Sequence, residues 1–174
     1  MKKISCTLGT IDKAITELEW YMHDLEVKVR KVMEQLAEIG IETATVGFGN
    51  AVYAGTNDVV VEPFKWVGNK LIISARGNAV AFIEFGTGVH YSTPHPKASE
   101  MGMVRGSYGY KLGRLDSWRY KGDPGNEGRV ITEGKHKGEV LTHGNPANRA
   151  MYNAGKDMRE KIVDVAKEVF GSND

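Results

Sequence analysis

The clearest pattern in the chain is a regular spacing of apolar residues between Ile11 and Ile39. The steps alternate between four and three residues, which is typical of a helix with one apolar stripe. The stripe consists of Ile11, Ile15, Leu18, Met22, Leu25, Val29, Val32, Leu36 and Ile39. Thr10 is suited to cap the start of this helix, and Gly40 is suited to follow its end. The pattern therefore predicts a helix over residues 10–39.

This predicted helix is long for the size of the chain. At 1.5 Å per residue it extends for about 43 Å, which is more than a compact domain of this length needs. We expect part of the stripe to pack on the chain's own sheet and the rest to contact a second subunit or another helix. A helix that faces only its own core is the alternative. The candidate subunit contact, called the N-terminal stripe below, consists of Ile11, Ile15, Leu18, Met22 and Leu25.

Short β-branched and apolar runs predict strands within residues 41–88. Gly68-Asn69 separates two such runs and predicts a two-residue hairpin turn. Residues 47–50 predict a second, weaker hairpin. Residues 79–85 suit either a strand or a short helix, and we favour a helix that Asn78 caps.

The C-terminal part carries a second helical pattern over residues 145–170. Asn145 is suited to cap this helix, Pro146 to occupy its first position and Gly171 to end it. Between the two helices, residues 89–144 have little periodicity. A segment this long without a period indicates a flexible insertion or arm, in which the runs 117–120 and 139–142 are predicted to pair.

Together these elements predict a single domain of the α+β class over residues 1–174. The two helices are expected to pack on a small, mostly antiparallel sheet, with the glycine-rich insertion beside it. The chain has 23 basic and 22 acidic residues, which argues against a protein that binds nucleic acid over its whole surface. One cysteine excludes an internal disulfide. No apolar run approaches the ~20 residues of a membrane span, so no membrane contact is expected.

Candidates for catalysis or metal binding are few. Glu84 is the one carboxylate in an apolar segment, and we expect it to accept hydrogen bonds from the amides of residues 86–88 rather than to act as a base. His90 and His95 match no zinc-binding spacing, and both are expected on a wet loop surface. A metal-dependent hydrolase built on Glu84, His90 and His95 is the third hypothesis for function. No cofactor motif occurs, so no cofactor is predicted.

Charge is unevenly distributed between the long helix and the insertion. Residues 95–121 hold six basic and two acidic residues, whereas the predicted helix holds seven acidic and four basic residues. Opposite charges of this kind suit head-to-tail self-association. Basic residues among aromatic ones can also contact nucleic-acid backbones, although a loop that orders on a protein partner is favoured. The candidates for contact with DNA are Arg105, Lys111 and Arg114, and a nucleic-acid-binding module is the second hypothesis.

Two segments resemble a known family. The string AFIEFGTG at Ala81–Gly88 resembles the A-x-hydrophobic-E-F-G-T motif of the neck, or tail-completion, proteins of long-tailed bacteriophages. His143–Ala154 resembles the part of that family in which a loop with a Pro and an Arg leads into a helix. The order of elements fits as well, but the insertion at 89–142 is longer than many members need. By motif, the resemblance covers about 20 residues.

The resemblance implies a non-enzymatic virion protein that completes the tail or joins it to the head, in a phage or a prophage. It implies a homo-oligomeric ring, with six subunits by analogy with tail symmetry or alternatively twelve, through which DNA passes without sequence-specific contacts. The implied neighbours are a head connector or portal and the tail tube or tail terminator proteins. The virion would be assembled in the cytoplasm of the bacterial host. The motif residues Glu84, Phe85, Gly86, Thr87 and Gly88 would shape a turn near a subunit contact.

Overall fold

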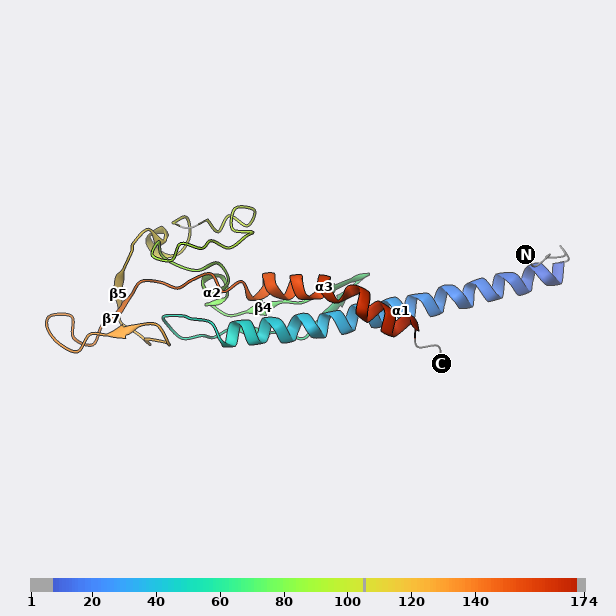
Figure 1. Ribbon diagram of the computed structural model, residues 1–174, viewed down its shortest axis with the longest axis horizontal. Coiled ribbons are helices and arrows are strands. Elements are labelled where there is room, and N and C mark those ends of the chain that lie inside the picture. Colours follow the sequence, from blue (N-terminus) through green and yellow to red (C-terminus); the bar gives the residue numbers. More distant parts are fainter. Residues whose placement is uncertain (1–7, 105, 172–174) are drawn as a thin grey trace.

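One helix dominates the computed structural model, which describes residues 8–104 and 106–171. This helix, α1 (Leu8–Gly49), has 42 residues and runs along most of the elongated molecule (Figure 1). The other elements gather around and beyond its C-terminal half, whereas its N-terminal half extends away from them (Figure 1). The predicted long helix is confirmed, but it exceeds the predicted range 10–39 at both ends, and Thr10 lies within it.

Short strands and three further helical segments make up the rest of the described fold. The strands are β1 (Val60–Val61), β2 (Lys65–Val67), β3 (Lys70–Ile72), β4 (Ala75–Arg76), β5 (Trp118–Tyr120), β6 (Arg129–Val130) and β7 (Val140–Thr142). The helical segments are α2 (Val80–Phe85), the 3₁₀ helix η1 (Tyr110–Gly113) and α3 (Ala150–Gly171). The strands form three antiparallel sheets: β1 with β4, β2 with β3, and β5 and β6 on either side of β7. The α+β class is confirmed, with the strands divided among three small sheets.

Two glycines allow α3 to pack closely against the C-terminal half of α1. A Cβ at Gly40 would lie 2.7 Å from Sδ of Met158, and one at Gly47 would lie 2.8 Å from Cβ of Ala150. The prediction that Gly40 ends the helix is therefore wrong, as is the hairpin at 47–50, because residues 41–49 continue the helix. Each helical glycine costs about 1 kcal/mol relative to alanine. Close helix packing offsets this cost.

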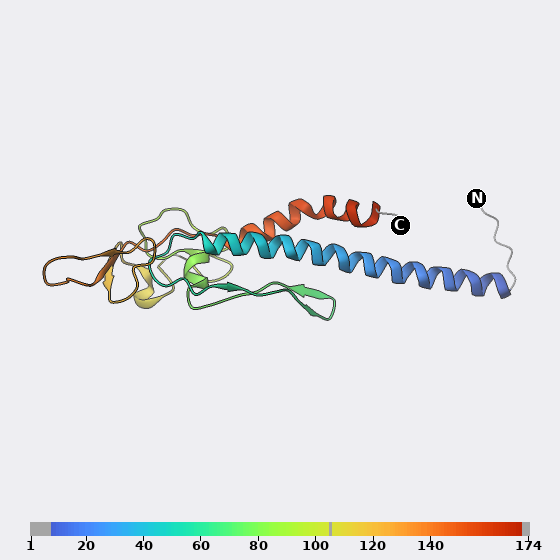
Figure 2. The ribbon, with the colours of Figure 1, turned by 90° about the horizontal axis from the view of Figure 1, so that it is seen from below.

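The C-terminal half of α1 lies between α3 on one side and the β2–β3 hairpin on the other (Figure 2). Nε1 of Trp66 in β2 donates a hydrogen bond to Oε1 of Glu34 at 3.0 Å, and the Arg30 guanidinium lies 4.8 Å from the centre of the Trp66 ring. Towards α3, Oγ1 of Thr43 donates to Oδ2 of Asp157 at 2.9 Å. These contacts hold one half of the helix in the fold, whereas the other half has no comparable neighbours among the described residues (Figure 1).

The best-buried core lies where α1 ends and α2 and α3 begin. It consists of Phe48, Ala51, Ala79, Ile83 and Ala150. Because alanines make up most of this cluster, the backbones of the three helices approach closely there. The core therefore supports the segment that carries the AFIEFGTG string. No helix among the described residues combines the length and apolar character needed to cross a membrane.

Two predicted strand pairings agree with the structure, whereas the predicted cap of the short helix does not. The hairpin turn at Gly68-Asn69 and the pairing of 117–120 with 139–142 are confirmed. Residues 80–85 are helical as favoured, but Asn78 does not cap them: Ala79 is the N-cap residue, and Asp58 binds the backbone just before the helix. The two carboxylate oxygens of Asp58 accept the amide hydrogens of Asn78 and Ala79 at 2.8 and 2.9 Å. These hydrogen bonds hold the pKa of the Asp58 carboxyl below its usual value.

Helix α3 begins five residues later than its sequence pattern predicts. Arg149, directly before it, has a left-handed backbone with φ of 64°, which separates the preceding loop from the helix. Asn145 does not cap the helix, because its Oδ1 accepts the hydroxyl hydrogen of Thr87 instead of a helix amide, and its side-chain amide donates to the carbonyl oxygen of Phe82 at 2.9 Å. Gly171 is the last helical residue described.

Candidate functional site

The two segments that carry the family resemblance lie side by side. The amide of Thr87 donates to the carbonyl oxygen of Asn145 at 2.9 Å, and the amide of Asn145 donates to Oγ1 of Thr87 at 3.1 Å. Further along, the amide of Asn148 donates to the carbonyl oxygen of Ile83 at 2.9 Å. Residues 58 apart in sequence thus form one hydrogen-bonded unit, and Asn145 is almost completely buried in it.

Glu84 caps the N-terminus of α3. Its Oε2 accepts the amide hydrogen of Met151 at 2.9 Å, and its Oε1 accepts that of Tyr152 at 3.0 Å. A carboxylate is well placed there, because the first amides of a helix lack intrahelical partners and the helix dipole favours negative charge. The expectation that Glu84 accepts hydrogen bonds from residues 86–88 is wrong, because its side chain points to α3 instead.

His95 contacts the same carboxylate through one nitrogen of its ring. Its Nε2 lies 3.1 Å from Oε1 of Glu84, and its Nδ1 accepts the amide hydrogen of Lys97 at 3.0 Å. Since Nδ1 acts as the acceptor, Nε2 carries the proton and donates to Glu84. The centre of the His95 ring lies 4.5 Å from the centre of the Phe85 ring and 5.5 Å from that of the Tyr152 ring. The expected wet surface for His95 is therefore wrong: the residue is 5% exposed because its loop folds over the start of α3.

The turn after α2 follows from the glycine that ends the helix. Gly86 has φ of 81°, and its amide donates to the carbonyl oxygen of Phe82 at 2.9 Å. A Cβ at this position would lie 2.7 Å from the amide nitrogen of Ala147. The string therefore forms a turn that meets the second motif segment directly. A subunit contact near this turn stays a prediction.

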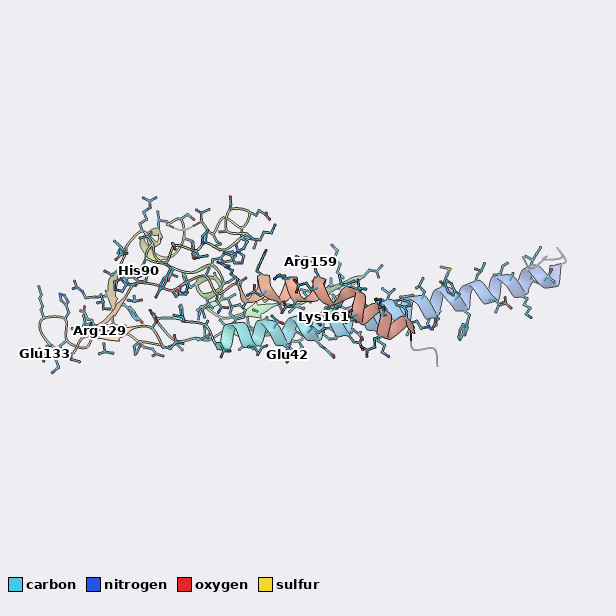
Figure 3. All side chains as sticks on the ribbon, viewed as in Figure 1. Glu42, His90, Arg129, Glu133, Arg159 and Lys161 are labelled. Atoms are coloured by element: carbon cyan, nitrogen blue, oxygen red, sulfur yellow. The ribbon has the colours of Figure 1, made fainter. Side chains whose placement is uncertain are left out.

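His90 lies apart from the pair of Glu84 and His95. It is in the loop region at the end of the molecule far from the free end of α1 (Figure 3). Its Nδ1 is 3.3 Å from Oδ1 of Asp116, and its ring centre is 4.7 Å from that of His143. His90 is exposed as expected. The meeting of His90 with Asp116 and His143 could not be predicted, because no local spacing links residues 26 and 53 positions apart.

An aromatic cleft of about 340 Å³ opens beside the turn after α2. Its aromatic lining residues are Tyr53, Phe82, Tyr108, Trp118 and Tyr120. Among the described residues that line it, Arg119 is the one with a charged side chain, and its Nε lies 3.7 Å from Oε2 of Glu139. The cleft thus offers mainly an apolar surface for contact.

The N-terminal stripe is exposed along its whole length. Leu18 is 62% and Met22 is 68% exposed, and the other three members are also exposed. Trp20 and Tyr21 on the same half of α1 are exposed too. Figure 3 shows this half of the helix with its side chains standing free of the rest of the described chain. The expectation that part of the long stripe lies outside the chain's own core is consistent with this exposure.

The three candidates for contact with DNA are only partly described. Arg105 lies outside the described residues, as does the side chain of Lys111, whose backbone belongs to η1. Arg114 is exposed, and its Nε donates to the carbonyl oxygen of Gly106 at 3.3 Å. Contact with DNA stays a prediction.

The chain was compared with protein-family models, with curated proteins and with solved structures, and it matches none of them.

Proposed function

We propose that the chain is a structural protein of a bacteriophage or prophage neck or tail, where it completes the tail or joins it to the head. Its subunits form a ring through which DNA passes. The observation that carries this proposal is the exposed N-terminal stripe on a helix that extends beyond the rest of the chain. The joined segments 81–88 and 143–154 support it, because they carry the resemblance to neck and tail-completion proteins and pack as one unit.

A second copy of the chain is the occupant that fits the stripe. Complete burial of one exposed Ile, Leu or Met side chain contributes about 1.5–3 kcal/mol. Five such side chains, repeated at every subunit of a closed ring, supply enough apolar burial to hold the ring together. The excess of acidic residues on α1 and of basic residues at 95–121 favours head-to-tail contacts between neighbouring subunits.

The ring has six subunits in this proposal, with twelve as the alternative. Its neighbours are a head connector or portal on one side and tail tube or tail terminator proteins on the other. The ring is assembled in the bacterial cytoplasm and remains in the virion. Arg105, Lys111 and Arg114 are the candidates for contact with DNA phosphates, which does not read sequence.

Light scattering from micromolar to near-millimolar protein tests the self-association. Leu18→Asp places a charge in the centre of the stripe and should prevent assembly, since an unpaired charge at an apolar interface is costly. The matched control is His23→Asp, which adds the same charge at an exposed position off the stripe. Both variants should retain the wild-type circular dichroism spectrum, because both positions are exposed.

The expected result is a closed oligomer for wild type and H23D and a monomer for L18D. A wild-type chain that stays monomeric over the whole range would contradict self-assembly through the stripe. An oligomer that survives L18D would place the subunit contact elsewhere. The DNA assignment has its own measurement: Arg114→Glu should leave the ring intact and weaken salt-dependent DNA binding.

A further inference from the structure

Three polar side chains from distant parts of the chain meet at the surface beside the motif unit. His90, Asp116 and His143 each offer one metal-ligand atom, and these atoms all lie within 4.8 Å of one another. Nδ1 of His90 is 3.3 Å from Oδ1 of Asp116, and Nδ1 of His143 is 3.6 Å from Oδ2 of the same carboxylate. The two rings face the two oxygens of one carboxylate.

The backbone brings these three residues together at Gly88. A Cβ on Gly88 would lie 3.0 Å from the carbonyl oxygen of His143 and 3.4 Å from that of Leu115. The absence of a side chain there lets the segments before His90, before Asp116 and at His143 converge. The proximity of these three backbone segments therefore follows from the fold.

Strand pairing holds two of these segments in register. Trp118 in β5 pairs with Thr142 in β7, so Asp116 and His143 lie just beyond the end of this antiparallel pair. The bridge between Thr87 and Asn145 then places the loop that leads to His90 next to His143. The carbonyl oxygen of Asp116 lies 3.2 Å from Nδ1 of His143, and Nδ1 gives up this contact and its proton when it binds an ion.

The donor set matches the chemistry of a divalent transition-metal ion. Imidazole nitrogen and carboxylate oxygen bind Zn²⁺ at about 2.0–2.2 Å, so two ligands of one tetrahedral ion lie about 3.3 Å apart. The two distances to the carboxylate are close to this value, and small rotations of the exposed rings bring the two nitrogens nearer. Two imidazoles with one carboxylate suit Zn²⁺, Ni²⁺ or Co²⁺ better than Mg²⁺ or Ca²⁺, which prefer oxygen ligands alone.

We infer that His90, Asp116 and His143 form a binding site for a divalent transition-metal ion, with Zn²⁺ as the best fit and water at the open coordination position. The inference is independent of the proposed assembly role. The ion ties the start, the middle and the end of the segment 89–144 to one another. It thereby anchors this segment to the unit formed by 81–88 and 143–154.

Calorimetric titration of Zn²⁺ into the untagged, chelator-treated full chain tests the site. Wild type should bind one equivalent. His90→Ala and His143→Ala should each weaken binding at least tenfold, as should Asp116→Asn, which keeps the size of the side chain. The matched control is His136→Ala, because His136 lies in the same segment beside Glu139 but outside this cluster. H136A should bind Zn²⁺ as wild type does.

A second readout separates the site from adventitious binding. Zn²⁺ should slow hydrogen exchange and proteolysis within residues 89–144 of wild type and H136A, and should have no such effect on H143A. All four variants replace residues at least partly exposed to solvent, so unchanged circular dichroism will verify their folding. The inference is overturned if wild type binds no Zn²⁺ at roughly 0.1 mM, which corresponds to about −5.5 kcal/mol of binding free energy. It is equally overturned if H90A and H143A bind Zn²⁺ as tightly as wild type.

Discussion

Removal of the Glu84 carboxylate should destabilise the fold far more than removal of an average surface charge. Glu84 is 5% exposed, and its two oxygens accept the first amides of α3 while Oε1 also accepts Nε2–H of His95. Glu84→Ala leaves these three donors without their acceptor at the point where α3 meets the core. The perturbation therefore acts on a helix start and on a buried side chain together.

The expected loss can be worked out from these contacts. A hydrogen bond to a charged group contributes about 1.5–3 kcal/mol, and loss of a helix cap alone costs about 1 kcal/mol. Water replaces part of the lost hydrogen bonding, because the α3 amides are only part-buried. We therefore expect a loss of about 3 kcal/mol in the free energy of unfolding. For a chain of this length that corresponds to roughly 6–12 °C in Tm.

Urea unfolding followed by circular dichroism measures this loss directly. Glu84→Gln keeps one acceptor oxygen and should lie between wild type and E84A. The control is Glu100→Ala, which removes an exposed ion pair with Lys97 and should cost under about 0.5 kcal/mol. If E84A loses no more than E100A, the carboxylate is not a cap on which α3 depends, and the reasoning is refuted.

Two further predictions concern single contacts. Asp58→Ala should lower Tm at pH 7. The difference in Tm from wild type should shrink as the pH falls below 3.8, because the folded state favours the charged Asp58 carboxylate, lowers its pKa and loses this stabilisation when the group is protonated. A difference in Tm that stays constant down to pH 2 would contradict this. Gly144→Ala should cost about 2 kcal/mol or more in urea unfolding, since φ is 83° and a Cβ would lie 2.2 Å from the carbonyl oxygen of Thr87. Gly138→Ala has the same φ strain and open space around it, so equal losses in both variants would show that the contact with Thr87 is unimportant.

The parts of the fold that could be predicted depend on residues close together in the chain. The apolar period from Ile11 to Ile39 predicted the long helix, and Gly68-Asn69 predicted the hairpin turn, because helix faces and tight turns are decided within a few residues. The end of α1 could not be predicted in this way. Gly40 carries a local stop signal, but the packing of Met158 from α3 overrides it.

In the candidate site, too, local features could be predicted from the sequence and contacts between distant segments could not. The segments 81–88 and 143–154 were both identified from sequence, yet their pairing was not, because hydrogen bonds between Thr87 and Asn145 leave no spacing signal. The capping role of Glu84 was missed for the same reason. The residue type at Asn145 predicted a helix cap there, whereas the carboxylate that caps α3 belongs to Glu84, more than 60 residues earlier in the chain.

The sequence alone determined the helical stripe, the α+β class and the two motif segments. Each of these depends on periodicity or residue type along a short stretch of chain, which neighbouring residues enforce. Only the tertiary structure decided that the N-terminal stripe is left exposed, that Glu84 caps α3, and that His90, Asp116 and His143 meet. These features arise where segments far apart in sequence are brought into contact, and there packing and hydrogen bonding across the fold outweigh local preference.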